Sequence, residues 1–159
     1  MRIVLSLLLL CATCVALGPA SSTGDEEPFS IVISTDNPVV KAGSHIWIKV
    51  QMTNTSKEAI DCTVAAVNGI DRRFQYRVVN ESDGKRVPKI MSKHPELEGG
   101  GSFKLCTLEP GSTTTRDALI SALFDTSPGK YSIQVSRRVS DKEKDGTVKS
   151  NTITITVNP

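Results

Sequence analysis

Few residues of this sequence have the types and spacing needed for catalysis or metal binding. The chain has only two histidines, His45 and His94, whereas a zinc site needs three or four ligands that converge on one point. No Gly-x-Ser-x-Gly motif marks a nucleophilic serine, and the glycines at 99–101 lack the Lys-Ser/Thr pair of a phosphate-binding loop. We therefore expect no catalytic site, no metal and no cofactor. A calcium site between loops and a pair of catalytic carboxylates stay open, since distances are not visible in a sequence.

The first 20 residues have the form of an export signal. Arg2 supplies a positive start and is followed by an apolar stretch over residues 3–17, which is shorter than the roughly 20 residues that span a bilayer. Small residues allow cleavage after Ala20 or after Ala16. We expect a signal peptide over residues 1–20 and a secreted or periplasmic protein.

Export determines how the cysteines are interpreted. Cys11 and Cys14 lie where a lipoprotein anchor would be, but neither follows the usual small residue, so this is the weaker alternative. Cys62 and Cys106 remain after cleavage. In an exported domain such a pair is more often a disulfide than a metal pair or a catalytic thiol. We expect a Cys62–Cys106 disulfide, with two separate buried thiols as the alternative.

The overall charge argues against several classes of partner. The chain has 19 Lys and Arg against 17 Asp and Glu, so it carries no strong basic or acidic excess. We expect no nucleic-acid binding, membrane contact only through the signal peptide, and a monomer. Aromatic residues make up only 4% of the chain, so a large aromatic binding platform is not expected either.

Short runs of alternating apolar and polar residues, separated by turns, are typical of antiparallel strands. The clearest run is 45–53, whose even-numbered residues are apolar, and the segment 118–124 is expected to be irregular or a short helix. Strands are predicted over 29–35, 45–53, 60–66, 73–79, 87–91, 103–108, 112–117, 131–138 and 148–157. The sequence indicates an all-β, antiparallel β-sandwich of about seven to nine strands. It occupies residues 29–158 and follows a linker over 21–28.

The turns of the C-terminal half carry a family resemblance. Pro110-Gly111 follows one predicted strand, and Pro128-Gly129 delivers Tyr131 into the next. With the hairpin that returns through residues 150–153, this half resembles immunoglobulin-like and fibronectin type III-like sandwiches. The paired turns are more weakly similar to the bacterial proteinase-inhibitor family of this fold. The resemblance implies that the Tyr131 hydroxyl binds nearby backbone where the chain changes sheets. Trp47 precedes Cys62, which departs from antibody-type domains.

Four residues are candidates for a binding surface: Trp47, His94, Arg137 and Arg138. Trp47 lies opposite the apolar face of its strand, where it either covers a sheet edge or forms an exposed contact anchor. The basic pairs at 72–73 and 137–138 are interpreted as solvated strand ends. Asn54 and Asn80 each begin an N-x-S/T pattern, which matters only in a host that glycosylates exported proteins.

The sequence alone favours an exported, non-enzymatic binding module for another exported protein or a glycan. Its loops 92–102 and 138–147 are the expected place of binding, because loops tolerate variation and frequently carry function. The alternatives are an inhibitor of an exported protease, a structural domain of the cell envelope that uses its edge strands, and an enzyme.

Overall fold

The computed structural model describes residues 27–67, 70–71, 73–90, 101–140 and 146–159. The signal peptide expected at 1–20 and most of the linker at 21–28 lie outside these ranges. The strands are β1 (Phe29–Ser34), β2 (Val39–Lys41), β3 (Trp47–Asn54), β4 (Ile60–Asp61), β5 (Val64–Val67), β6 (Ile70–Asp71), β7 (Phe74–Asn80), β8 (Gly101–Lys104), β9 (Thr107–Leu108), β10 (Thr113–Leu119), β11 (Gly129–Arg138) and β12 (Thr147–Asn158). The prediction of an all-β fold is confirmed.

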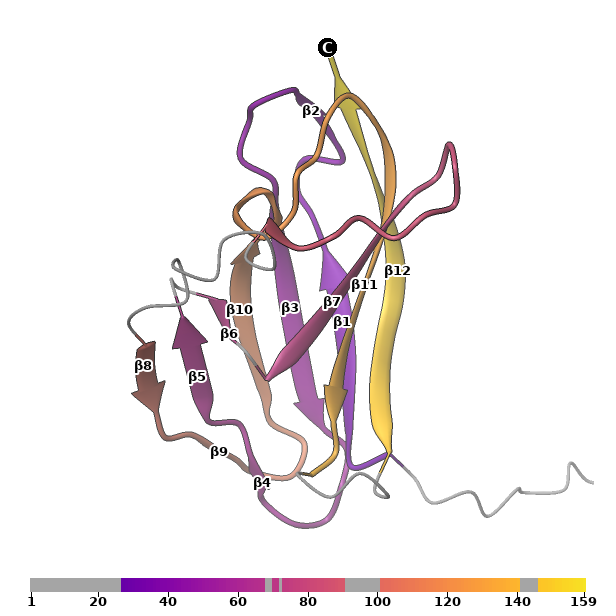
Figure 1. Cartoon of the computed structure of the whole chain (residues 1–159). Coiled ribbons are helices and arrows are strands. Elements are labelled where there is room, and N and C mark those ends of the chain that lie inside the picture. Colours follow the sequence, from indigo (N-terminus) through magenta and orange to yellow (C-terminus); the bar gives the residue numbers. More distant parts are fainter. Residues whose placement is uncertain (1–26, 68–69, 72, 91–100, 141–145) are drawn as a thin grey trace, which may run out of the picture.

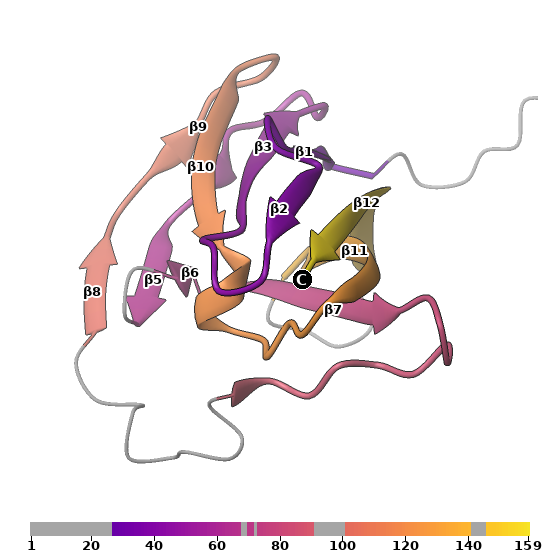
Figure 2. The same ribbon diagram turned by 90° about the horizontal axis from the view of Figure 1, so that it is seen from above.

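Two sheets form the body of the domain. One has the strand order β1-β3-β10 and the other β2-β12-β11-β7. Figures 1 and 2 show them as two layers, with the small sheets β4-β9 and β6-β5-β8 on the β10 side. β10, which contains the strand predicted at 112–117, is an edge strand of its sheet.

The core forms where the apolar faces of the two layers meet. In β3 the even-numbered residues Ile48, Val50 and Met52 are at most 2% exposed, whereas Trp47 on the opposite face is 51% exposed. In β11 the odd-numbered residues from Tyr131 to Arg137 are buried. Period-two alternation buries one face of each strand, so the sequence pattern fixes which side chains form the core.

Two features of the second sheet depart from a simple antiparallel sandwich. β2 pairs with β12 in parallel, with Thr156 opposite Val39, although no strand was predicted there. The register of β11 and β12 shifts between Gln134 and Ser136, which places an extra residue in β12. This bulge changes which residues of β12 face inward, because side chains alternate with period two.

Two predicted strands are each divided. The segment 60–66 forms β4 and β5, and the segment 103–108 forms β8 and β9. Between β4 and β5 the Asp61 carboxylate accepts a hydrogen bond from the Thr63 N–H at 2.8 Å. A side chain that binds the backbone two residues ahead competes with strand pairing and turns the chain.

The strand predicted at 87–91 is wrong for its described residues. Val87 N–H bonds to Val78 O at 2.9 Å, after which Ile90 N–H bonds to Leu123 O at 2.8 Å instead of continuing along β7. Pro88 lies between them and has no N–H to donate, so a continuous ladder cannot form. The segment therefore leaves β7 for the chain around η3 (Ile120–Ala122), the short helix expected within 118–124.

The turn before β11 is fixed by Tyr131. Its side chain is 2% exposed, and its hydroxyl donates a hydrogen bond to Ser127 O at 2.7 Å. Gly129 lies close beside the ring, since a Cβ at this position would be 3.5 Å from the Tyr131 hydroxyl oxygen. Tyr131, Gly129 and Pro128 thus form one compact corner at the entry to β11.

Candidate functional site

The residues expected to form a binding surface do not come together. Trp47 begins β3 and Arg138 ends β11, and both strands run downward in Figure 1, so the two residues lie at opposite ends of the sandwich. His94 lies outside the described residues, as do most of the loop 92–102 and part of the loop 138–147. The described part of the chain therefore does not bring the expected residues together into one surface.

Arg137 is buried, which corrects the expectation that it is a solvated strand end. It is 6% exposed. Its guanidinium carbon lies 5.8 Å from the Phe29 ring centroid and 5.6 Å from that of Phe74, so two aromatic faces flank the charge. It donates to Asp61 O at 2.8 Å and contacts Met52 Sδ at 3.4 Å. Burial lowers the pKa of Arg137, with a further contribution from the nearby charge of Arg73.

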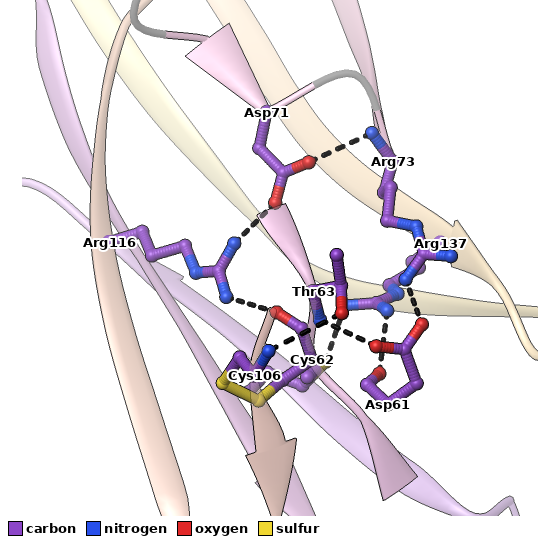
Figure 3. A network of polar contacts seen from close by, with 9 residues as sticks. Asp61, Cys62, Thr63, Asp71, Arg73, Cys106, Arg116 and Arg137 are labelled. Atoms are coloured by element: carbon purple, nitrogen blue, oxygen red, sulfur yellow. Dashed lines mark hydrogen bonds and ion pairs between the residues drawn. A yellow bond between two sulfur atoms is a disulfide. The ribbon is translucent and has the colours of Figure 1, made fainter. Parts of the chain in front are cut away.

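Asp61 connects Arg73 to the same cluster. Its carboxylate forms an ion pair with the Arg73 guanidinium, while its backbone carbonyl binds Arg137 (Figure 3). Burial acts to raise the pKa of Asp61, but hydrogen bonds from Thr63 and Arg73, together with the Arg73 charge, outweigh it and lower the pKa to about 2. Asp61 is therefore ionised throughout the physiological range.

Arg116 ties β10 to the small sheets. Its guanidinium pairs with the Asp71 carboxylate at 2.5 Å and also donates to Cys62 O (Figure 3). Asp71 in turn accepts the Arg73 N–H at 3.0 Å. The two carboxylates and three arginines thus form one network, which we call the arginine cluster: Asp61, Asp71, Arg73, Arg116 and Arg137.

The expected disulfide closes the cluster on one side. Cys62 and Cys106 are bonded, with their Cα atoms 4.8 Å apart, and Cys62 N–H also bonds to Cys106 O at 2.9 Å. The bond joins the segment between β4 and β5 to the one between β8 and β9. It therefore holds the carbonyl that Arg116 binds, and it fits an oxidising compartment.

Two cavities flank the arginine cluster. The larger one, about 600 Å³, is lined by Pro28, Phe29, Ile60, Asp61, Arg73, Gln75, Arg137, Arg138, Val139 and Ser140. It has three guanidinium groups in its wall against the one carboxylate of Asp61. The smaller one, about 350 Å³, is lined by Val50, Val64, Asp71, Phe74, Tyr76, Lys104, Cys106, Thr114, Thr115, Arg116 and Asp117. Its wall has two cationic and two anionic side chains, so their charges balance.

A second feature missed by the sequence analysis is an exposed apolar edge. Phe103 in β8 is 70% exposed and Leu105 just after it is 78% exposed, the highest values among the large hydrophobic residues described. β8 pairs with β5 on one side and, within the described residues, with nothing on the other. The spacing of Phe103 and Leu105 was visible in the sequence, but alternation alone does not say which face of a strand is covered.

The two glycosylation patterns differ in their surroundings. Asn54 is 1% exposed, and its side-chain nitrogen donates to Glu58 O and Leu108 O, both at 2.8 Å. The folded protein therefore has no free acceptor at this position. Asn80 is half-buried, and its Oδ1 accepts the Ser82 hydroxyl at 2.8 Å.

Two kinds of feature are absent from the described ranges. No group of three or more His, Cys, Asp or Glu side chains there is arranged to hold a metal ion. Likewise, no helix in those ranges has the length and apolar character to cross a membrane.

No known family model matches this sequence, and no significant match was found among curated protein sequences. Among solved structures, the alkylpurine DNA glycosylase AlkC of Pseudomonas fluorescens has 11% identity and a TM-score of 0.41, covering 83% of this chain and 31% of its own. A beta-glucosidase from Listeria innocua has 15% identity and a TM-score of 0.43, covering 82% and 16%. AvmM, which catalyses macrocyclization in alchivemycin A biosynthesis, has 12% identity and a TM-score of 0.40, covering 84% and 90%.

These comparisons correct one expectation. The three structures named above are those of enzymes, and the expectation that this chain is not an enzyme is therefore withdrawn. This chain corresponds to less than a third of the glycosylase and of the beta-glucosidase. At these identities and TM-scores, the likenesses assign no activity to it.

Proposed function

We propose that this chain is an exported domain that binds an extended segment of another protein along the edge of β8 that no other described strand covers. The observation that carries this proposal is the exposure of Phe103 and Leu105, at 70% and 78%, on and beside that edge. Export is supported by the Cys62–Cys106 bond and by the apolar leader of the sequence. An immunoglobulin-like family membership is supported by the Tyr131 corner and by the two facing sheets.

The backbone of β8 can pair with a partner strand. An edge strand has unpaired N–H and C=O groups along one side, and a partner strand that adds there satisfies them. Phe103 lies in β8 and Leu105 directly follows the strand, so both exposed side chains are close enough along the chain to contact the same partner. Burying a phenylalanine removes on the order of 150–250 Å² of surface from water, which makes it a strong anchor.

Lys104 indicates the charge of the partner. It lies between the two apolar residues in the sequence, so its side chain points to the other face of β8. Like charges opposite each other across paired strands are unfavourable, whereas opposite charges stabilise. A second copy that paired its own Lys104 opposite this one would be disfavoured. A partner segment that alternates apolar and acidic residues fits this edge best.

The test is a capture experiment with matched variants. The purified protein, Phe103→Ser/Leu105→Ser and Val32→Ser/Val39→Ser are each immobilised and exposed to extracellular extract of the host. Val32 and Val39 are the control because they are 52% and 58% exposed on other strands. We expect a protein that the wild type and the control retain and that the β8 variant loses at least tenfold. A protease with this behaviour would identify the inhibitor alternative.

The proposal would be contradicted if the wild type, the β8 variant and the control variant retained every captured protein equally well. Thermal unfolding of each variant shows whether a loss of binding is only a loss of folding. Because all four replaced side chains are at least half exposed, we expect little change in the midpoint.

A further inference from the structure

We propose that the larger cavity beside the arginine cluster is a second binding site, which takes an organic carboxylate with an apolar body. This inference is independent of the β8 edge, since none of the residues that line the cavity belongs to β8. The cavity volume, about 600 Å³, is in the range of small-molecule sites.

The charges in the cavity wall favour an anion. Arg73, Arg137 and Arg138 line it, together with one acidic residue, Asp61. Asp61 is already paired with Arg73. Within the described ranges, neither Arg137 nor Arg138 forms an ion pair, so two guanidinium charges are not neutralised there. Of the neighbouring charged groups outside the wall, Asp71 and Arg116 pair with each other.

Arg137 is the most informative member of the wall. A guanidinium has five N–H donors, and two of them bond to described residues, namely to Asp61 O and Met52 Sδ. Its side chain is 94% removed from solvent, where an uncompensated charge is costly. The Phe29 and Phe74 rings offset part of this cost. An anion bound in the cavity can accept further hydrogen bonds from this guanidinium and balance its charge.

The apolar part of the wall determines the rest of the ligand. Phe29, Ile60 and Val139 line the cavity alongside the arginines, with Pro28 at the same wall. A bare inorganic ion would leave these side chains without a contact. A planar carboxylate matches the two parallel N–H donors of a guanidinium, and an attached hydrocarbon body fills the apolar side.

Four ligand probes distinguish binding through the carboxylate head group from binding through the apolar body. Octanoate carries both, 1-octanol carries the body alone, acetate carries the head alone, and inorganic phosphate represents a small multivalent anion. Binding to the whole protein is followed by calorimetry and by ligand-observed NMR. We expect octanoate to bind at least tenfold more tightly than any of the other three. If 1-octanol binds as tightly, the arginines contribute nothing; if phosphate binds more tightly, the carboxylate assignment is wrong.

The protein variants locate the site. Arg138→Glu reverses a charge in the wall and changes an exposed side chain, so the variant is expected to fold. Arg77→Glu is the matched control, because Arg77 is an exposed arginine of β7 that does not line the cavity. We expect Arg138→Glu to weaken octanoate binding about tenfold or more and Arg77→Glu to change it less than twofold. Equal effects of the two variants, or no effect of Arg138→Glu, would overturn the proposal.

Discussion

The side-chain amide of Asn151 binds both backbone groups of Ile33. Ile33 N–H donates to Asn151 Oδ1 at 2.8 Å, and Asn151 Nδ2 donates to Ile33 O at 3.0 Å. Ile33 belongs to β1 in one layer and Asn151 to β12 in the other. The amide therefore does for β1 what a neighbouring strand would do, and it joins the two sheets along one side of the sandwich.

We expect Asn151→Ala to lower the free energy of unfolding by about 1–2 kcal/mol, because two hydrogen bonds to a strand backbone are lost. Urea unfolding measures the change. Thr152→Ala is the control, since Thr152 is the next residue and is also exposed. The control is expected to cost about 0.5 kcal/mol or less. Similar losses in both variants would mean that the amide bridge does not stabilise the domain.

Asn54 gives a second, larger effect. It is 1% exposed and donates to two carbonyl oxygens, Glu58 O and Leu108 O. Asn54→Ala removes both of these bonds and also the bonds that Asn54 Oδ1 accepts from the Ser56 N–H and hydroxyl, so we expect a loss of about 2–4 kcal/mol. Asn80→Ala should cost about 1 kcal/mol, because Asn80 is half-buried and accepts its bonds from Ser82 within one turn. Urea unfolding measures both losses. A larger loss for Asn80→Ala than for Asn54→Ala would contradict the prediction.

The disulfide should contribute at least as much stability as either asparagine. Cys62 and Cys106 are separated by 44 residues, and the chain-entropy model gives about 4 kcal/mol for a loop of that length. We expect a reductant to lower the urea midpoint of the wild type clearly. The same reductant should leave the midpoint of Cys62→Ala/Cys106→Ala unchanged, which controls for other effects of the reagent. No shift in the wild type would exclude a stabilising role.

We expect Asp61 to make the stability of the folded protein sensitive to acid. Its pKa is lowered from 3.8 to about 2 in the folded protein, so the folded state holds the ionised form more strongly than the unfolded chain does. This contribution to stability is complete above about pH 4 and is lost as the pH falls toward 2. Urea unfolding across that range measures it, and Asp61→Asn should flatten the dependence there.

Glu109→Gln is the control for this pH experiment. Glu109 is an exposed carboxylate in the turn after β9. Its replacement should leave the slope between pH 4 and pH 2 as steep as in the wild type. If Asp61→Asn keeps that slope too, the ion pair with Arg73 does not account for the acid sensitivity.

Much of the fold could be predicted from local pattern. The alternation in β1, β3, β7 and β11 is regular, and burial follows it residue by residue. The same alternation also placed Arg137 on the inward face of β11. Its basic side chain nevertheless suggested a solvated position, because charged residues are seldom buried without a partner. The Phe29 and Phe74 rings that flank it belong to strands far from β11 in the sequence, so the sequence alone does not show that they meet Arg137.

The bulge in β12 could not be predicted either. The run of threonines and isoleucines after Asn151 alternates so evenly that a regular strand is the simplest interpretation. The register shift depends on Ser150, whose hydroxyl accepts the Val135 N–H at 2.9 Å and donates to Asn151 O at 2.6 Å. Side-chain bonds of this kind decide where a ladder slips, and they follow from tertiary contact.

The parallel pairing of β2 with β12 has a mechanical consequence. β2 lies near the N-terminal end of the described chain and β12 at its C-terminal end, and both run in the same direction. A force that pulls these two ends apart drags the strands past each other, so it loads their bonds in shear and all at once. The bonds from Ala42 N–H to Asn158 O and from Thr156 N–H to Pro38 O belong to this clamp. Stretched from its two ends, the domain should resist extension until the clamp ruptures in one step, which single-molecule force measurements would record as one sharp peak.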